Sequence, residues 1–172
     1  MTELRGDIVV LRPLRFDDAE ALRAIHREPA VAAFWGSFSD DFPFDEPEST
    51  RFTIWVGEEI AGLVQYGEEQ VPEYRHAWID VFVATAQHGR GVGTDAVRTV
   101  LRHLIGDRGH HRVTIDPAAD NVAAVRAYEK AGFERVGVMR SAERSPEGVW
   151  RDAVLMEHVD LGRAYDQGAN GT

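Results

Sequence analysis

A glycine-rich segment near the middle of the chain has the composition of an anion-binding turn. The segment lies between a predicted strand and a predicted amphipathic helix, and it reads His88-Gly89-Arg90-Gly91-Val92-Gly93-Thr94. Glycines leave backbone N–H groups uncovered, and a helix N-terminus adds partial positive charge, so together they suit a pyrophosphate group. Glycine also favours plain tight turns, so the composition alone leaves both interpretations open.

The segment can be compared with two known nucleotide-binding motifs. Its glycines match the dinucleotide fingerprint as Gly91-x-Gly93-x-x-Ala96, and Asp116 stands about 20 residues further along, where that motif has a ribose-binding acid. However, residues 84–88 separate the preceding predicted strand from the first glycine, and the elements before it resemble an antiparallel meander. No Gly-Lys-Ser/Thr follows, which excludes a P-loop. A nicotinamide dinucleotide site is therefore disfavoured.

Asp80, in the predicted strand before the glycine-rich segment, is a candidate base. Strand alternation puts Trp78, Asp80 and Phe82 on one face, so the Asp80 carboxylate would lie between two aromatic rings. Partial burial there would raise its pKa from about 4 and make it a better proton acceptor. Asp116 ends the next predicted strand, and Tyr128 lies on a predicted helix. From the residues alone, these three could equally be an exposed strand residue, a turn residue before proline, and a core aromatic residue.

These candidates must be positioned by the strands and helices that the hydrophobic pattern predicts. Short apolar or alternating runs indicate strands, and apolar residues at spacings of three and four indicate helices. Because hairpins and crossovers occur in one chain, we expect an α+β fold with a mixed sheet rather than a purely parallel one. The predicted strands span residues 8–14, 52–56, 60–66, 74–83, 112–116, 133–140 and 149–159, and the predicted helices span 17–28, 30–35, 92–104 and 121–131.

A second segment, in the predicted helix that carries Tyr128, completes a family resemblance. It reads Asn121-x-x-Ala124-x-x-x-Tyr128-Glu129-Lys130-Ala131-Gly132-Phe133. This segment and the glycine-rich segment resemble the two signatures of the GNAT N-acetyltransferase superfamily. In the first signature, Gln/Arg-x-x-Gly-x-Gly/Ala, Gly91 and Gly93 match, whereas His88 replaces the leading residue. Within the superfamily the chain resembles aminoglycoside 6′-N-acetyltransferases most, with ribosomal-protein N-terminal acetyltransferases as the close competitor.

The resemblance implies a mostly antiparallel central sheet with splayed middle strands and helices on both faces. A single N-acetyltransferase domain is expected over residues 1–160, and residues 161–172 lack apolar periodicity and are expected to be a disordered tail. The resemblance also implies acetyl-CoA as the co-substrate, with its pantetheine arm inserted between the splayed strands. The implied cofactor-binding residues are Val81, Phe82, Val83, His88, Gly89, Arg90, Gly91, Val92, Gly93, Thr94, Asn121 and Tyr128.

The same resemblance implies roles for individual residues. Asp80 would be the base that removes a proton from the amine, and Tyr128 would be the general acid toward the coenzyme A sulfur. Asn121 would hydrogen-bond the pantetheine or a phosphate, although an asparagine there could also be a helix N-cap. A backbone N–H among residues 81–83 would stabilise the thioester oxyanion. The implied acceptor-site residues are Trp35, Asp80 and Asp116.

Composition and charge narrow the function classes further. The 172 residues carry a formal net charge of −10 and no cysteine, which excludes a disulfide scaffold, a thiolate zinc site and a cysteine nucleophile. The seven histidines show no zinc spacing, so no metal is expected. The negative charge argues against nucleic-acid binding. The chain has neither an apolar span nor a signal-peptide pattern, so a cytoplasmic protein that does not bind membranes is expected.

The leading hypothesis is an acetyl-CoA-dependent N-acetyltransferase that acts on a primary amine of a small cationic acceptor. An aminoglycoside would be such an acceptor, and the chain would then confer antibiotic resistance. The acidic loop at residues 37–48 would add longer-range attraction for a cation. The alternatives are a protein N-terminal acetyltransferase and a non-catalytic acyl-CoA-binding module. We expect a monomer or a homodimer.

Overall fold

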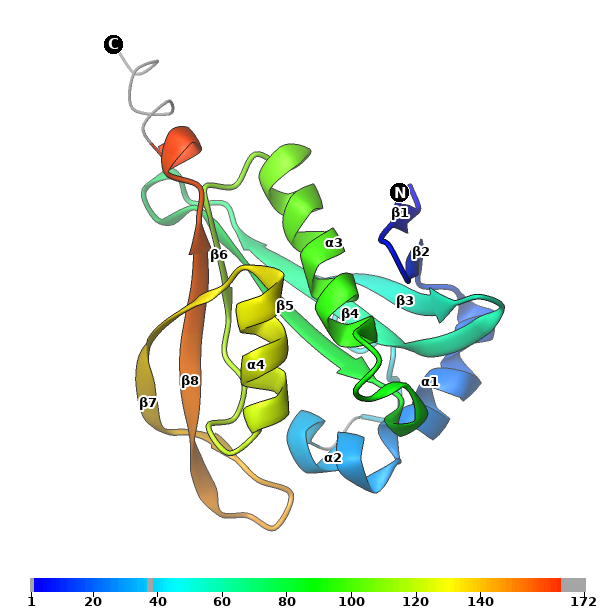
Figure 1. Ribbon diagram of the computed structural model, residues 1–172. Helices are drawn as coiled ribbons and strands as arrows, with labels where there is room; N and C mark the ends of the chain where they lie inside the picture. Colours follow the sequence, from blue (N-terminus) through cyan, green and yellow to red (C-terminus); the bar gives the residue numbers. More distant parts are fainter. Residues whose placement is uncertain (1, 37–38, 165–172) are drawn as a thin grey trace.

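The central feature of the fold is an open, mixed β-sheet (Figure 1). The computed structural model describes residues 2–36 and 39–164. The strand order in this part of the chain is β1-β2-β3-β4-β5-β6-β8-β7, and every neighbouring pair is antiparallel except the parallel pair β5–β6. The predicted mixed, mostly antiparallel sheet is therefore confirmed. The strands are β1 (Leu4–Arg5), β2 (Val10–Pro13), β3 (Thr50–Val56), β4 (Glu59–Glu69), β5 (His76–Val83), β6 (Arg112–Ile115), β7 (Glu134–Arg144) and β8 (Trp150–Val159).

Helices cover both faces of this sheet, as predicted. The helices α3 (Val92–Gly106) and α4 (Val122–Ala131) lie in front of the sheet in Figure 1 and share its larger hydrophobic core. The shorter helices α1 (Ala19–His26) and α2 (Pro29–Trp35) form a second core against the opposite face of β4 and β5. Among the described residues, no helix combines the length and the apolar character that crossing a bilayer requires.

The sheet opens between β5 and β6. These two strands pair only at Ala77↔Val113 and Trp78↔Thr114. Beyond Trp78, β5 continues along β4 to Val83, while β6 continues along β8 to Ile115. The predicted splay of the middle strands is therefore confirmed, and it is formed by the strands that carry or precede the two candidate aspartates.

The face that each β5 side chain occupies follows the predicted alternation. The register between β4 and β5 is unbroken from Glu69↔His76 to Gly62↔Val83, so no bulge in β5 reverses the pattern. Ile79 packs into the larger core, whereas Phe82 belongs to the second core on the other face. Asp80 therefore shares the face of Trp78 and Phe82, as the sequence predicts.

Several element ends differ from the prediction. The first predicted strand is shorter, because only Val10–Pro13 is paired as β2, and Asp116 lies just beyond β6. β7 runs on to Arg144 instead of ending at residue 140, because a turn over residues 145–148 closes a long hairpin with β8. As the edge strand it is almost wholly exposed, so it has no alternating apolar pattern to mark its end. The predicted tail starts with a helical turn at residues 161–164, and residues 165–172 lie outside the described chain.

Candidate active site

Two carboxylates and a tyrosine meet at the opening of the sheet. Asp80 lies on β5, Asp116 follows β6, and Tyr128 lies on α4. The three groups are close enough to influence one another, because the charges of both aspartates raise the pKa of Tyr128 and that of Asp116 raises the pKa of Asp80. The predicted catalytic and acceptor residues, which are distant in the sequence, are thus brought together.

Asp80 is the most strongly perturbed carboxyl group of this site. Its side chain is open to solvent, yet the surrounding protein removes enough hydration to raise its pKa to about 7. The backbone N–H of Val81 donates to its Oδ1 at 2.9 Å and opposes this rise. The charges of Asp116, Glu46 and Glu143 increase it further. A carboxyl group with this pKa is suited to exchange protons near neutral pH.

Asp116 is held rigidly against β8. The residue before it pairs with Met156 across the β6–β8 ladder, and the carbonyl of Pro117, the residue after it, accepts a hydrogen bond from the N–H of Val154 at 2.9 Å. Desolvation raises the pKa of Asp116, and the nearby charge of Glu143 raises it further. The two aspartates therefore approach the opening from opposite sides, each from a well-paired strand.

Tyr128 is both a core residue and a member of this site. Its side chain is 8% exposed and packs within the larger core. Burial raises its pKa above the ordinary value, and the charges of Asp80 and Asp116 raise it further, so the hydroxyl keeps its proton at neutral pH. An O–H group is thus available as a hydrogen-bond donor beside the two carboxyl groups.

Backbone groups of β5 face the opening. The N–H of Ala84 bonds the carbonyl of Ala61 at 2.8 Å, so by strand alternation the even-numbered residues at this end face β4. The N–H and C=O groups of Val81 and Val83 then face the open side. Two local side chains meet them: the Val81 N–H donates to Asp80, and the Val83 carbonyl lies 2.9 Å from His88 Nε2. The pairing of these backbone groups with an extended pantetheine arm stays a prediction.

The glycine-rich loop leads directly into α3, and its glycines are needed for different reasons. Gly91 has φ +81° and ψ 0° at the N-cap of α3, a conformation that L side chains rarely adopt. Gly93 lies inside the helix, where an added Cβ would only touch Val83 Cγ2 at 3.5 Å, an ordinary contact. The backbone conformation therefore explains the glycine at position 91, whereas neither conformation nor packing explains the glycine at position 93. A close approach by a ligand at the helix N-terminus would explain Gly93.

Asn121 caps helix α4. Its side-chain oxygen accepts a hydrogen bond from the N–H of Ala124 at 3.2 Å. This is the N-cap interaction that the sequence left open as an alternative. The contact of Asn121 with pantetheine or phosphate stays a prediction.

The acceptor side of the opening is bounded by α2 and by the acidic loop. Trp35, at the end of α2, packs edge-on against Phe82 with ring centroids 4.8 Å apart. In the acidic loop, Asp45 and Glu46 form ion pairs with buried Arg51 at 2.6 and 3.3 Å, so these acids are not simply solvated. Residues 37 and 38 of this loop lie outside the described chain.

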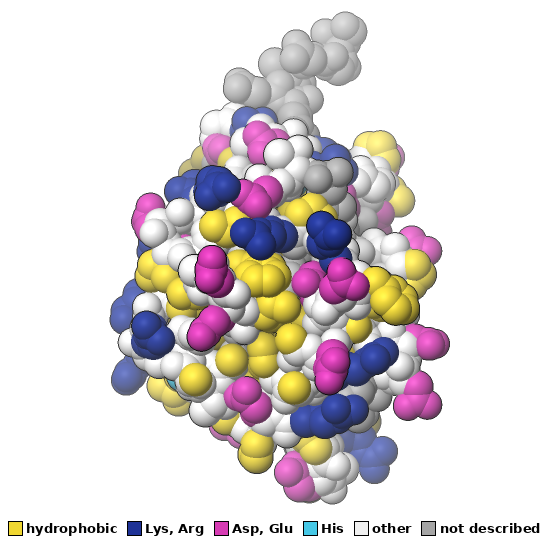
Figure 2. Space-filling model, turned by 90° about the vertical axis from the view of Figure 1, so that its right-hand side faces the viewer, with side chains coloured by type: hydrophobic (Ala, Val, Ile, Leu, Met, Phe, Trp, Pro, Cys, Tyr) yellow, Lys and Arg dark blue, Asp and Glu magenta, His cyan; other side chains and the backbone are white. Residues whose placement is uncertain are grey.

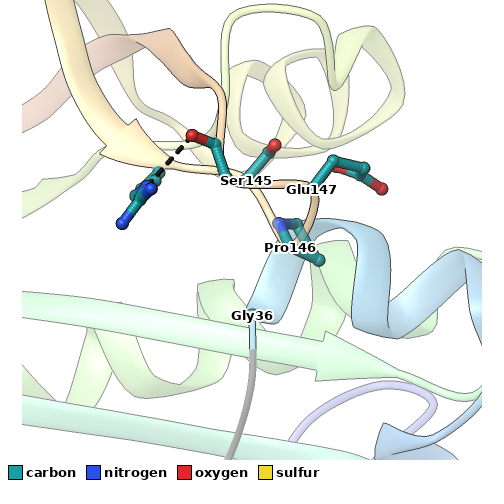
Figure 3. Close-up of a pocket in the computed structure, with 6 residues that line it drawn as sticks. Gly36, Ser145, Pro146 and Glu147 are labelled. Carbon is teal, nitrogen blue, oxygen red and sulfur yellow. Dashed lines mark hydrogen bonds between the residues drawn. The ribbon is translucent and has the colours of Figure 1, made fainter.

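A hollow of about 510 Å³ lies next to this wall (Figure 3). Figure 3 shows Gly36, at the end of α2, below the hairpin turn that carries Ser145, Pro146 and Glu147. None of the predicted site residues lines this hollow. It is therefore a neighbour of the candidate site and does not by itself identify a ligand.

Sequence reasoning missed two residues of the site, Glu143 on β7 and Arg151 on β8. Glu143 raises the pKa of both aspartates, and it forms an ion pair with Arg151. Both residues lie in the β7–β8 hairpin, whose first strand is predicted to end four residues too early. Arg151 lies in the predicted strand over residues 149–159, but Glu143 lies beyond the predicted end of the preceding strand at residue 140, so no predicted strand pairing joins the two.

The surface charge is mixed rather than gathered on one face. Figure 2 shows the side of the molecule that lies to the right in Figure 1, where acidic and basic side chains surround a central group of hydrophobic ones. The net charge of −10 therefore does not produce a uniformly acidic surface on this side. Among the described residues, no cluster of three or more side chains could hold a metal ion.

Comparisons with known proteins agree with this arrangement. The sequence profile of the Acetyltransferase (GNAT) family matches residues 15–133. A Bacillus subtilis protein named "Probable N-acetyltransferase YjcK" is 26% identical over 170 residues, covering 87% of this chain and 92% of that protein. An aminoglycoside N(6′)-acetyltransferase type 1 of Klebsiella pneumoniae is 41% identical over 66 residues, which cover 38% of this chain and 33% of that protein.

A solved structure gives the same result over a larger part of the chain. The structure of AAC(6′)-Ib in complex with paromomycin and acetyl-CoA is 25% identical with a TM-score of 0.73, and the match covers 96% of this chain and 100% of that one. The family profile spans more than half of the chain, and the fold, the open sheet and the glycine-rich loop agree with it. The chain therefore belongs to the GNAT family of acetyltransferases, and it is an acyltransferase that uses acetyl-CoA as its acetyl donor.

Proposed function

We propose that this enzyme acetylates a primary amine of a small, cationic acceptor, with aminoglycosides as the first class to test. The observation that carries the proposal is the convergence of two carboxyl groups, Asp80 and Asp116, at the opening of the sheet, near Glu143, which already pairs with Arg151. Like charges at one site are costly unless a cation neutralises them. An acceptor with several ammonium groups would supply that neutralisation.

Each residue then has a step to perform. Acetyl-CoA supplies the acetyl group as a thioester. Asp116 holds the acceptor ammonium group, and Asp80 removes one of its protons, which its pKa of about 7 permits near neutral pH. The freed amine forms a bond to the thioester carbonyl carbon while the Val81 N–H, released from Asp80 as that carboxylate takes up the proton, donates to the carbonyl oxygen. As the carbon–sulfur bond breaks, the sulfur takes the electron pair and a proton from Tyr128, and the nitrogen gives up its remaining extra proton, which leaves a neutral amide and restores the Tyr128 hydroxyl.

The partial match to an aminoglycoside acetyltransferase and the shape match to AAC(6′)-Ib support an acceptor of this class. The acidic loop supports it less strongly than the sequence suggests, because Arg51 already neutralises part of that loop. Trp35, which packs against buried Phe82, would offer apolar surface to the rings of the acceptor.

A direct assay tests the acceptor. Thiol release from acetyl-CoA is measured with aminoglycosides, polyamines, short peptides with a free N-terminus and neutral amines, using Tyr128→Phe as the impaired reference. We expect acetylated aminoglycoside or polyamine as the best product, identified by mass spectrometry. Preferred acetylation of peptides would replace the proposal with protein N-terminal acetylation. Coenzyme A binding without turnover on any amine would indicate a non-catalytic binding module.

The cofactor loop is tested separately by calorimetry. Gly93→Val puts a side chain where no protein atom requires a glycine, so the fold should persist. Loss of one charge-assisted bond to a phosphate is worth roughly 1.5–3 kcal/mol, so acetyl-CoA affinity should fall by at least tenfold. Gly106→Val is the matched control, because Gly106 also lies on α3 with open space around it. Equal acetyl-CoA affinity of the two variants would indicate that the glycine-rich loop is a plain turn without a phosphate contact at Gly93.

A further inference from the structure

The two halves of the sheet are connected differently on its two faces. On one face α3 and α4 pack across the opening as part of the larger core. On the acceptor face the bridge is the seven-residue helix α2. One side of α2 is fixed to the β5 half, because Trp35 packs against Phe82 with ring centroids 4.8 Å apart.

The other side of α2 is joined to the β8 half by the side chain of Arg151. Its Nη1 donates to the carbonyl of Ala33 at 2.9 Å, and its guanidinium lies 5.1 Å from the ring centroid of Phe34. The same guanidinium forms an ion pair with Glu143, which faces Arg151 across the β7–β8 hairpin. The Arg151 side chain is 17% exposed, so most of it is enclosed by these contacts. One residue thus links β7, β8 and α2.

We propose that Arg151 is a positioning residue that ties α2 to the β7–β8 hairpin and so sets the separation between Asp80 and the carboxylates of Asp116 and Glu143. Only two residue pairs join β5 to β6, so the strand ladder gives little resistance to widening of the opening. Repulsion among the carboxylates favours widening. A planar guanidinium is suited to oppose this widening, because its separate N–H groups bind a carboxylate and a carbonyl at fixed angles.

The first test measures the separation without using activity. The chain has no cysteine, so cysteines introduced at exposed Glu58 and Glu147 give unique spin-label sites on the two halves. Arg151→Met keeps an apolar stem beside Phe34 but removes every donor, and we expect it to broaden the label-to-label distance distribution. Arg144→Met is the control, because Arg144 donates to the carbonyl of Gly148 within its own turn and makes no hydrogen bond to α2 in the described part of the chain. An unchanged distribution in Arg151→Met would overturn the proposal.

The second test uses kinetics and rests on the proposed acetyl transfer. Misplacement by about 1 Å can cost about 100-fold, so Arg151→Met should raise the acceptor KM and lower kcat by at least tenfold in kcat/KM. Its acetyl-CoA affinity should stay that of the wild type. Arg151→Lys, which can satisfy one partner at a time, should fall between the two and keeps the test usable if Arg151→Met is poorly folded.

The two tests fail in distinguishable ways. If the wild type acetylates no amine, the proposed function fails, and the distance measurement still decides the role of Arg151. If the distances broaden while acceptor KM and kcat stay unchanged, Arg151 is merely structural and the positioning role is overturned.

Discussion

Two regions on either side of the glycine-rich loop use an aspartate in opposite ways. At the start of α3, Asp95 accepts hydrogen bonds from the N–H groups of Asp7, Ile8 and Val9 at 3.2, 2.7 and 3.0 Å. Burial alone would raise the pKa of Asp95, but these three donors hold it below its ordinary value. At the opening of the sheet, Asp80 receives one N–H, and its pKa rises to about 7.

The difference teaches that desolvation raises the pKa of both carboxyl groups and that the number of hydrogen-bond donors decides whether the rise persists. Asp95 is only 3% exposed, yet its three donors overcome the desolvation and its pKa is lowered. At Asp80 the desolvation outweighs the single donor, and the charges of nearby carboxylates add to the rise. The first therefore anchors the fold, and the second is prepared to accept a proton.

The largest effect should come from removing the proton acceptor. Asp80→Asn should lower kcat by about 10²–10⁴-fold, the range of a general base, in steady-state assays with the best acceptor. The same variant should be more stable than the wild type at pH 8 in thermal unfolding. Because the folded pKa of Asp80 is raised, ionisation of its carboxyl group costs stability as the pH rises from about 4 through about 7. Asp120→Asn, at an exposed loop position, is the control; wild-type turnover in Asp80→Asn would remove Asp80 from catalysis.

Asp95 should show the opposite pH dependence of stability, because its pKa is lowered and not raised. Asp95→Asn puts an amide before three N–H donors and should lower the free energy of unfolding by about 3 kcal/mol, since each bond to a charged group contributes roughly 1.5–3 kcal/mol. A pKa that is lowered in the folded state gives stability that is present above the unfolded pKa of about 4 and is lost as the pH falls through the lower folded value. Denaturant unfolding should therefore show the two proteins converging at strongly acid pH. Asp107→Asn is the control, and a pH-independent difference would contradict the assignment.

Removing a neighbouring negative charge should lower the pKa of Asp80, with a smaller effect on the kinetics than removing Asp80 itself. Asp116→Asn removes a negative charge that raises the pKa of Asp80, so the acid limb of the kcat/KM profile should move to lower pH. The acceptor KM should rise more than kcat falls. Glu143→Gln should move the limb in the same direction but less, because its charge has the weaker influence. A limb that stays in place in both variants would assign it to another group.

The smallest effect should be the response to salt. The Debye length shrinks from about 10 Å at 0.1 M to about 3 Å at 1 M, so the KM of a cationic acceptor should rise with ionic strength. The stability difference between wild type and Asp95→Asn should change little, because that carboxylate is buried among its donors. A salt titration of both quantities is the measurement. A KM that does not respond to salt, or a preferred acceptor without charge, would contradict a cationic substrate.

Sequence patterns predict features that lie within one strand or helix, and they miss contacts between residues that are distant in the chain. Alternation predicts the face of Asp80 correctly, and the apolar spacing within residues 121–131 predicts the helix that carries Tyr128, because these patterns reflect neighbours along one element. The roles of Asp95 and Arg151 leave no such pattern. The partners of Asp95 lie 86–88 residues away, and the Ala33 carbonyl that Arg151 binds lies 118 residues away. Buried Arg51 was missed for another reason: its partner Asp45 lies only six residues away, but the acidic residues there make the loop resemble a solvated charge run.

The open side of β5 also has a consequence for amide hydrogen exchange. Amides inside a ladder exchange only when their strand opens, whereas the N–H groups of Val81 and Val83 have no neighbouring strand on their side. Their exchange should therefore follow events at the site and not global unfolding. The unlabelled protein contains its own reporters: slowed exchange at these two amides would register the entry of acetyl-CoA, and the rest of the sheet would provide the internal reference.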